Sequence, residues 1–123
     1  MTTVAELFDA LKYRVEVNPD TGTRRYYNSA NQLHCEDGPA IVCTNGYREW
    51  WQNGQPHRDN GPAAVWPDGG KIWHQNGLRH RTDGPAVEYA DGNKEWWLKG
   101  VRYTEQAYRA KLAALEQTLE QTP

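Results

Sequence analysis

Three histidines are the first residues that could do chemistry, because they recur at a fixed spacing. His34, His57 and His80 lie 23 residues apart. Imidazoles that share a zinc ion must each approach it to about 2 Å. Histidines at one position of successive hairpins would instead lie about 9.5 Å apart, two strand spacings. We therefore expect each ring to hydrogen-bond a neighbouring turn, and we expect no metal and no cofactor.

Other residue types that support catalysis do not form a recognisable pattern. Cys35 and Cys43 form no CxxC pair, so we expect free thiols, and a metal site with His34 would lack a fourth ligand. The chain has no Ser-His-Asp spacing, no glycine-rich phosphate loop and no carboxylate pair that the repeat leaves unexplained. We expect that the protein is not an enzyme.

The histidines belong to a gapless repeat, whose full copies are residues 31–53, 54–76 and 77–99. Each copy has a His, then Asp or Asn three residues later, then Gly-Pro-Ala, an Asn-Gly or Asp-Gly pair and a Trp. A partial copy occupies 13–30, and another begins at 100. We expect the recurring residues to be structural, and they are His34, His57, His80, Asp37, Asn60, Asp83, Trp50, Trp73 and Trp96.

Each copy predicts one β-hairpin. Asn45-Gly46, Asp68-Gly69 and Asp91-Gly92 are turn dipeptides, which we expect at equivalent hairpin tips in type I′ turns. Asn53-Gly54 and Asn76-Gly77 then reverse the chain again. The prediction is an all-β repeat protein, a single-layer antiparallel meander of about eight strands over residues 13–103.

The two ends differ from the repeats. Thr3-Val4-Ala5-Glu6 is a capping box that predicts a helix over 1–12, and Thr104 can cap a second helix over 104–119. Both helices would cap the sheet, since open edge strands invite aggregation. The 123 residues form one domain, 1–123.

Composition narrows the class of partner. The chain has 14 Lys+Arg against 16 Asp+Glu, which argues against a dedicated binder of duplex nucleic acid. Six Trp and seven Tyr supply apolar area that few aliphatic residues provide. The sequence has no apolar stretch long enough for a membrane span or a signal segment, so we expect a soluble, cytoplasmic protein.

The pattern W-x-x-N-G-x-x-H…G…D-G-x-x-x-W over residues 13–103 resembles the MORN repeat family. It is most similar to the divergent bacterial and phage form, in which H-R-x-D-G-P-A replaces the usual histidine-glycine segment. The resemblance implies single-layer sheets of stacked hairpins that bind proteins, self-associate or bind lipid head groups. It also implies a phage or prophage origin, and thus the cytoplasm of a bacterial host.

Two sets of side chains are candidates for partner binding. Strand alternation separates Trp50, Trp73 and Trp96, which we expect to be largely buried, from an aromatic set on the opposite face. Arginines beside these aromatics form a basic rim suited to an acidic protein, a phosphate head group or a nucleotide, although a solvated polar face is the simpler alternative. The candidates are Arg58, Arg79, Arg81, Arg102, Trp51, Trp97 and His74.

The second predicted helix carries an apolar stripe of four residues, Tyr108, Leu112, Leu115 and Leu119. Its spacing is typical of a helix–helix seam, which would give a homodimer. If the helix folds back instead, it would cover the Trp51/Trp97 face. The sequence favours a non-catalytic protein-binding module, with a phage-encoded inhibitor of a host protein as its specific form. The alternative is a binder or sponge for a nucleotide or a phosphate head group.

Overall fold

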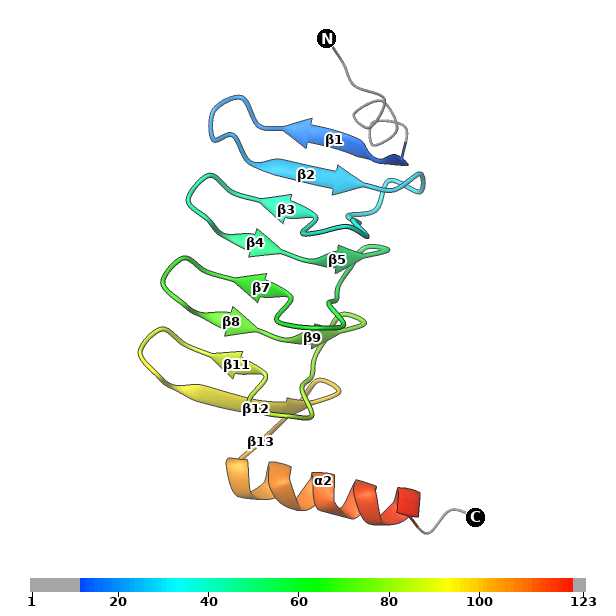
Figure 1. Cartoon of the computed structure of the whole chain (residues 1–123), viewed down its shortest axis with the longest axis vertical. Helices are drawn as coiled ribbons and strands as arrows, with labels where there is room; N and C mark the ends of the chain where they lie inside the picture. The colour runs from blue at the N-terminus through cyan, green and yellow to red at the C-terminus, as the bar shows by residue number, and fades with distance from the viewer. Residues whose placement is uncertain (1–11, 121–123) are drawn as a thin grey trace.

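The computed structural model describes residues 12–120, and its main feature is one nine-stranded antiparallel sheet. The helix predicted over 1–12 lies, apart from residue 12, outside the described residues. The strands follow one another in chain order along the sheet, as Figure 1 shows from blue to yellow. They are β1 (Arg14–Val17), β2 (Arg24–Tyr27), β3 (Ile41–Val42), β4 (Arg48–Glu49), β7 (Ala64–Val65), β8 (Lys71–Ile72), β11 (Val87–Glu88), β12 (Lys94–Leu98) and β13 (Val101–Tyr103).

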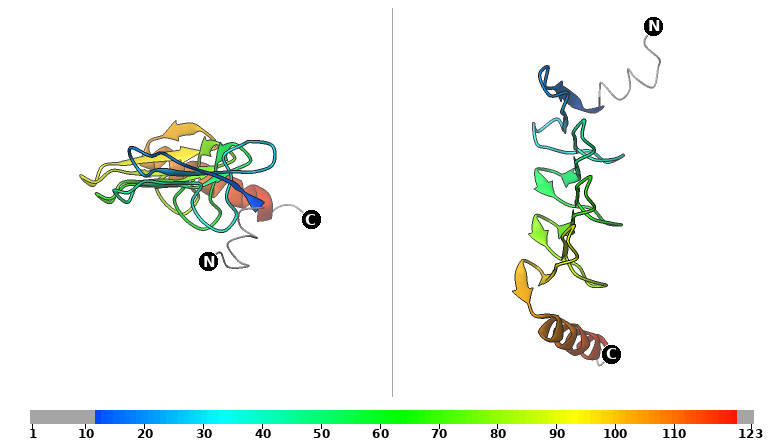
Figure 2. Two further views of the ribbon diagram at one scale, coloured as in Figure 1. Left: turned by 90° about the horizontal axis from the view of Figure 1, so that it is seen from above. Right: turned by 90° about the vertical axis from the view of Figure 1, so that its left-hand side faces the viewer.

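Each repeat also has a second, smaller hairpin beside the main sheet. Two of these hairpins form separate two-stranded sheets, β5 (Trp51–Gln52) with β6 (Gln55–Pro56), and β9 (His74–Gln75) with β10 (Leu78–Arg79). In the last repeat β12 runs on to pair with β13, which makes the main sheet nine strands rather than the eight expected. The predicted antiparallel meander is confirmed. Seen edge-on in Figure 2, it is a thin stack from which the loops project.

The turns at the tips of the main hairpins differ from the prediction. Type I′ geometry needs positive φ at both central residues, whereas only Gly46, Gly69 and Gly92 have it, at 98°, 99° and 93°. The Gly46 N–H donates to the Cys43 carbonyl, as in a three-residue loop closed by a glycine bulge. The Asn45 side chain accepts the Tyr47 N–H at 2.9 Å, so this asparagine stabilises the turn by a side-chain hydrogen bond rather than by a positive φ.

True type I′ geometry occurs in the smaller hairpins instead. Both residues of Asn53-Gly54, Asn76-Gly77 and Lys99-Gly100 have positive φ. Each of these glycine N–H groups donates to a carbonyl of the preceding repeat, and the acceptors are Leu33, Pro56 and Arg79. The smaller hairpins are thereby stacked on one another, alongside the main sheet.

Helix α2 (Glu105–Glu120) closes the C-terminal end of the stack, where Figure 1 shows it beyond β13. The Ala107 N–H donates to Thr104 Oγ1 at 3.2 Å, so Thr104 is the predicted N-cap. The helix does not cover the face that carries Trp97. It contacts β12 and β13, and its Tyr108 packs on Trp96.

Few of residues 12–120 are buried, and most of those are small, as a single-layer sheet requires. The alanines of the three Gly-Pro-Ala segments are at most 1% exposed, and Ile41, Ala64 and Val87 are buried near them. Two large side chains are almost fully buried, Val87 and Tyr108.

Candidate functional site

Four aromatic residues form one column across the sheet. The main-chain N–H groups of Trp50 and Trp73 donate to Ala63 and Ala86, both at 2.7 Å. The Tyr26 N–H donates to Ala40 in the same way, so Tyr26 begins the column and Trp96 ends it. The three tryptophans are only partly buried, which corrects the expectation of a largely buried column. Loop side chains cover Trp50 and Trp73, and side chains of α2 cover Trp96.

The cover over the two central tryptophans is arginine. The Cζ atom of Arg58 lies 3.8 Å from the centre of the Trp50 ring, and Arg81 lies at the same distance from Trp73. Nη1 of each arginine donates to a carbonyl of its own loop, that of Pro62 or Pro85, at 3.1 and 3.0 Å. A cation over an indole face is attracted by the ring quadrupole. Arg58 and Arg81 thus hold the loops on the column.

A tyrosine takes the place of arginine at both ends of the column. The ring centres of Tyr13 and Tyr26 are 6.1 Å apart in a T-shaped arrangement, and the Tyr13 hydroxyl accepts the Glu36 N–H at 2.9 Å. Tyr108 packs on Trp96 at 5.0 Å and donates its hydroxyl to the Arg81 carbonyl at 2.6 Å. Burial raises the pKa of both phenols. Each end is thus closed by a tyrosine whose hydroxyl bonds the loop main chain, and Arg109 also lies over the Trp96 ring at 5.4 Å.

The repeated histidines bond the type I′ turns. Nδ1 of His34, His57 and His80 accepts the N–H of Asn53, Asn76 and Lys99 respectively, at 2.9 to 3.0 Å. Burial, and then the charge of Lys99, lowers the pKa of His80. Within residues 12–120 no three His, Cys, Asp or Glu side chains gather as a metal site. Cys35 and Cys43 are both free thiols.

The residues at the Asp37 position differ between repeats in their partners. Asp83 accepts a bond from Nε of Arg81 at 2.9 Å. Asp37 pairs with Lys12 at 3.4 Å instead, because Cys35 stands where the later repeats have arginine. In the second repeat the residue at this position is Asn60, whose neutral side chain cannot form an ion pair with Arg58. The repeat therefore keeps its geometry but varies its charge.

The other face of the sheet carries the remaining partner-binding candidates. Trp97 follows Trp96 in the continuous strand β12, so the two side chains point to opposite faces. Arg79 lies 5.0 Å from the Trp97 ring, and Arg102 is opposite Trp97 in the register. His74 is opposite Arg79. The four predicted arginines thus form no single rim. Arg58 and Arg81 lie on the face with Trp50 and Trp73, whereas Arg79 and Arg102 lie on the face with Trp97.

Glu95 lies at the centre of this second cluster, and the sequence analysis missed it. Its carboxylate pairs with Arg79 at 3.5 Å, accepts Nε1 of Trp97 at 2.9 Å and accepts the Tyr89 hydroxyl. The hydrogen bond from Tyr89 is the main cause that lowers the pKa of Glu95. Trp51 belongs elsewhere, because it packs on the core of Tyr13, Cys35 and Ala40.

Charged residues are distributed unevenly between the two faces. In the register, a row of directly opposed residues runs across the sheet as Arg24, Val42, Arg48, Val65, Lys71, Glu88 and Lys94. A second row, on the opposite face, contains three glutamates and one arginine, Glu16, Arg25, Glu49 and Glu95. We call Arg24, Arg48, Lys71 and Lys94 the basic row. None of the four makes an ion pair within residues 12–120.

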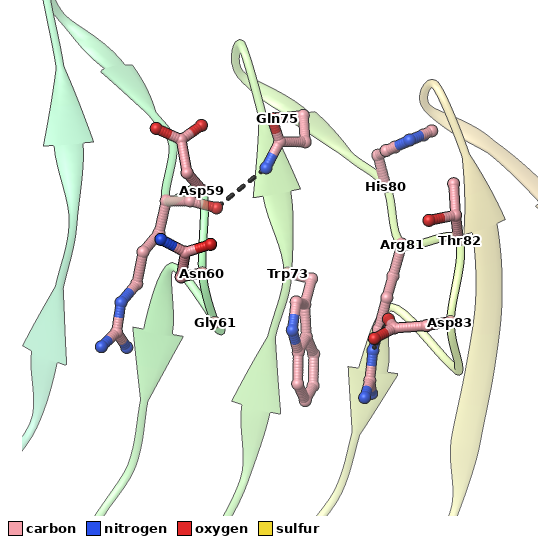
Figure 3. Close-up of a pocket in the computed structure, with 10 residues that line it drawn as sticks. Asp59, Asn60, Gly61, Trp73, Gln75, His80, Arg81, Thr82 and Asp83 are labelled. Atoms are coloured by element: carbon pink, nitrogen blue, oxygen red, sulfur yellow. Dashed lines mark hydrogen bonds and ion pairs between the residues drawn. The ribbon is translucent and has the colours of Figure 1, made fainter.

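A groove lies between the loops of the second and third repeats. It has a volume of about 640 Å³, and Trp73 lies between Gly61 on one side and Arg81 on the other (Figure 3). Gln75 Nε2 donates to the Arg58 carbonyl at 2.8 Å across its upper end. Asp59 and Asp83 also line it, so its walls carry both signs of charge.

The apolar stripe of α2 is buried at its N-terminal end and exposed at its C-terminal end. Tyr108 is 2% exposed against the sheet, and Leu112 is partly buried. Leu115 and Leu119 are 47% and 75% exposed. The seam predicted for a homodimer is therefore reduced to its leucines, and the homodimer stays a prediction.

Comparison of the chain with protein families, with characterised proteins and with solved structures finds no match. Residues 12–120 include no helix that is long and apolar enough to cross a membrane. The contacts and charges of the site carry the functional argument. The sequence analysis named Arg58 and Arg81 as candidates but did not predict that they stack on the column. One signal was present, because each follows a column tryptophan by eight residues.

Proposed function

We propose that this chain is a non-catalytic protein-binding module that recognises an acidic segment of a partner protein. The observation that carries the proposal is the basic row. Its four cations lie on alternate strands, with no ion-pair partner within residues 12–120. Neighbours in the row are about 9.6 Å apart, and the row is about 29 Å long, at 4.8 Å per strand.

The spacing of the basic row suits a peptide better than a nucleic acid. Duplex DNA carries one charge per about 1.7 Å of its axis, so a row this sparse would neutralise few phosphates. Acidic side chains two helical turns apart lie about 10.8 Å apart, close to the spacing of the row. The net charge of −2 also opposes non-specific binding to a polyanion.

Apolar side chains lie between the cations. Val42 and Val65 are in the same row, and both are partly buried. Protein interfaces combine apolar contact at the centre with charged groups at the rim. The resemblance to the phage form of the MORN family extends the proposal to a bacterial host protein, whose activity the module would inhibit in the host cytoplasm.

A small-ligand binder is the second candidate, and the groove over Trp73 favours it. Its volume of about 640 Å³ lies in the range of small-molecule sites. Phosphate is a poorer match than a singly charged carboxylate, because Asp59 and Asp83 line the same groove and repel a dianion more strongly. Nη1 of both arginines is already bonded to a loop carbonyl, which leaves few donors for the several oxygens of a phosphate. We therefore favour a protein partner.

The test uses a glutamate peptide of about 20 residues, which as a helix spans about 30 Å. Binding is measured by fluorescence anisotropy at low and at physiological salt. We expect salt-dependent binding that Arg48→Glu/Lys71→Glu abolishes. The matched control is Lys99→Glu/Lys111→Glu, which changes the net charge equally at two exposed residues off the row. Equal loss in both variants, or preferential binding to phosphatidylserine vesicles or to single-stranded DNA of equal charge, would contradict the proposal.

A further inference from the structure

The third repeat shows how this fold holds a carboxylate beside its stacked arginine. The Arg81 guanidinium lies on Trp73 and contacts two acids. Its Nε donates to Asp83 at 2.9 Å, and its Nη1 lies 3.3 Å from Glu88 Oε1. Glu88 lies in line with the basic row, directly opposite Lys71 on one side and Lys94 on the other. The guanidinium therefore reaches from the loop to that row.

In the second repeat both acids are replaced. Asn60 stands at the position of Asp83, and Val65 stands at that of Glu88, each 23 residues earlier. Arg58 keeps the stack on Trp50 at 3.8 Å and the bond to Pro62 at 3.1 Å. Within residues 12–120 it makes no ion pair. Burial lowers the pKa of Arg58.

Two further cations flank the same position. Val65 is directly opposite Arg48 on one side and Lys71 on the other. The equivalence of the repeats directs the Arg58 guanidinium toward Val65, as Arg81 is directed toward Glu88. Three cations thus surround one small apolar side chain. Neither Arg48 nor Lys71 has an ion-pair partner within residues 12–120. Acidic residues do lie nearby, because Glu88 is directly opposite Lys71 in the register and Glu36, Asp37 and Asp59 line a groove with Arg58.

We propose that Arg58 is a carboxylate-binding subsite, which receives one Asp or Glu side chain of the partner's acidic segment above Val65. The carboxylate would stand where that of Glu88 stands in the next repeat. Arg58 uses Nη1 for Pro62, and its Nε, which in Arg81 is bonded to an acid, has no hydrogen-bond partner among residues 12–120. A guanidinium edge of this kind binds carboxylates with defined geometry. This inference rests on the proposed function and names the residue at its centre.

The test places a carboxylate in the subsite from within the chain. Val65→Glu copies the third repeat, and we expect it to weaken binding of the glutamate peptide about tenfold, the effect of one charge-assisted hydrogen bond. Val65→Gln has nearly the same shape without the charge, and it should retain most of the affinity. If Val65→Glu does not fold, Asn60→Asp supplies the carboxylate from an exposed loop position instead.

The reciprocal variant opens a second subsite. Glu88→Val frees Arg81 of one acid, and we expect tighter binding of the peptide than in the wild type. The Nε–Hε resonances of Arg58 and Arg81 report occupancy directly by NMR. In the wild type the peptide should move the Arg58 signal and leave that of Arg81 in place.

The outcomes separate this inference from the proposed function. If the peptide binds but neither Val65→Glu nor Asn60→Asp weakens it more than Val65→Gln, the subsite is wrong and the module survives. If inorganic phosphate moves the Arg58 signal as strongly as the peptide does, the site is a general small-anion site and the carboxylate subsite is wrong. If the wild type does not bind the peptide, the proposed function fails, and the subsite with it.

Discussion

Replacing Tyr108 by phenylalanine tests how the C-terminal end of the stack is closed. The side chain is 2% exposed, and its ring packs on Trp96. The hydroxyl donates to the Arg81 carbonyl at 2.6 Å and accepts the Gly84 N–H at 3.3 Å. Tyr108→Phe removes both bonds and retains the ring. The carbonyl of Arg81 would then lose its partner beneath the helix.

The expected cost follows from these two bonds. A buried polar group left without a partner costs about 1–3 kcal/mol. The Gly84 bond is the longer one, and the loop around it is partly exposed, so water can replace it. We therefore expect Tyr108→Phe to lower the free energy of unfolding by about 1–2 kcal/mol. The melting temperature should fall by about 4–10 °C for a domain of this size.

Urea unfolding followed by tryptophan fluorescence measures this change, provided that the m-value is unchanged. Tyr103→Phe is the matched control, because the Tyr103 hydroxyl makes no hydrogen bond within residues 12–120. It should change stability by less than about 0.5 kcal/mol. If the two variants have the same stability, the hydroxyl of Tyr108 does not hold the helix on the stack.

Three further perturbations test other parts of the fold. Lys99 has φ 47° where the earlier repeats have asparagine, so Lys99→Asn should stabilise the protein by about 0.5–1 kcal/mol in thermal unfolding. Burial lowers the pKa of His74 and His80, so the unfolded chain binds more protons near pH 6. Stability should be complete above the unfolded pKa of about 6.5 and fall as the pH drops below it. Denaturation midpoints at several pH values check this, and His74→Gln should reduce the slope; a slope unchanged in that variant would contradict the assignment. Leu115 is 47% exposed, so Leu115→Glu should leave the fold intact and abolish any dimer that light scattering detects; a dimer that persists uses another surface.

The sequence predicted the architecture because the period and the turns agree. A gapless 23-residue repeat with one turn dipeptide per strand pair permits little except a meander in chain order, and the sheet has that order. The turn type was wrong at Asn45-Gly46, because this dipeptide fits both a two-residue loop and a three-residue loop with a glycine bulge. The pairing of Cys43 with Tyr47 decides between them, and it depends on the register.

The candidate site was predictable in its columns but not in its contacts. Aligning the copies places Arg24 with Arg48 and Tyr26 with Trp50, as the structure has them. That Arg58 lies on Trp50 depends on the path of the loop back over the sheet, which no periodicity reports. The predicted rim combined arginines of both faces for the same reason.

An unpaired row of cations costs the free protein little, which is why the fold can keep one. Two unit charges about 9.6 Å apart repel by about 0.4 kcal/mol in water, and salt at physiological strength, with a screening length of about 8 Å, lowers this further. The same row attracts an acidic partner through several charges at once. Around Val65 the equivalence of the repeats adds a third cation, Arg58, which is partly buried, so the repulsion there is larger. The position that is least favourable in the free protein is thus the one that gains most from a bound carboxylate.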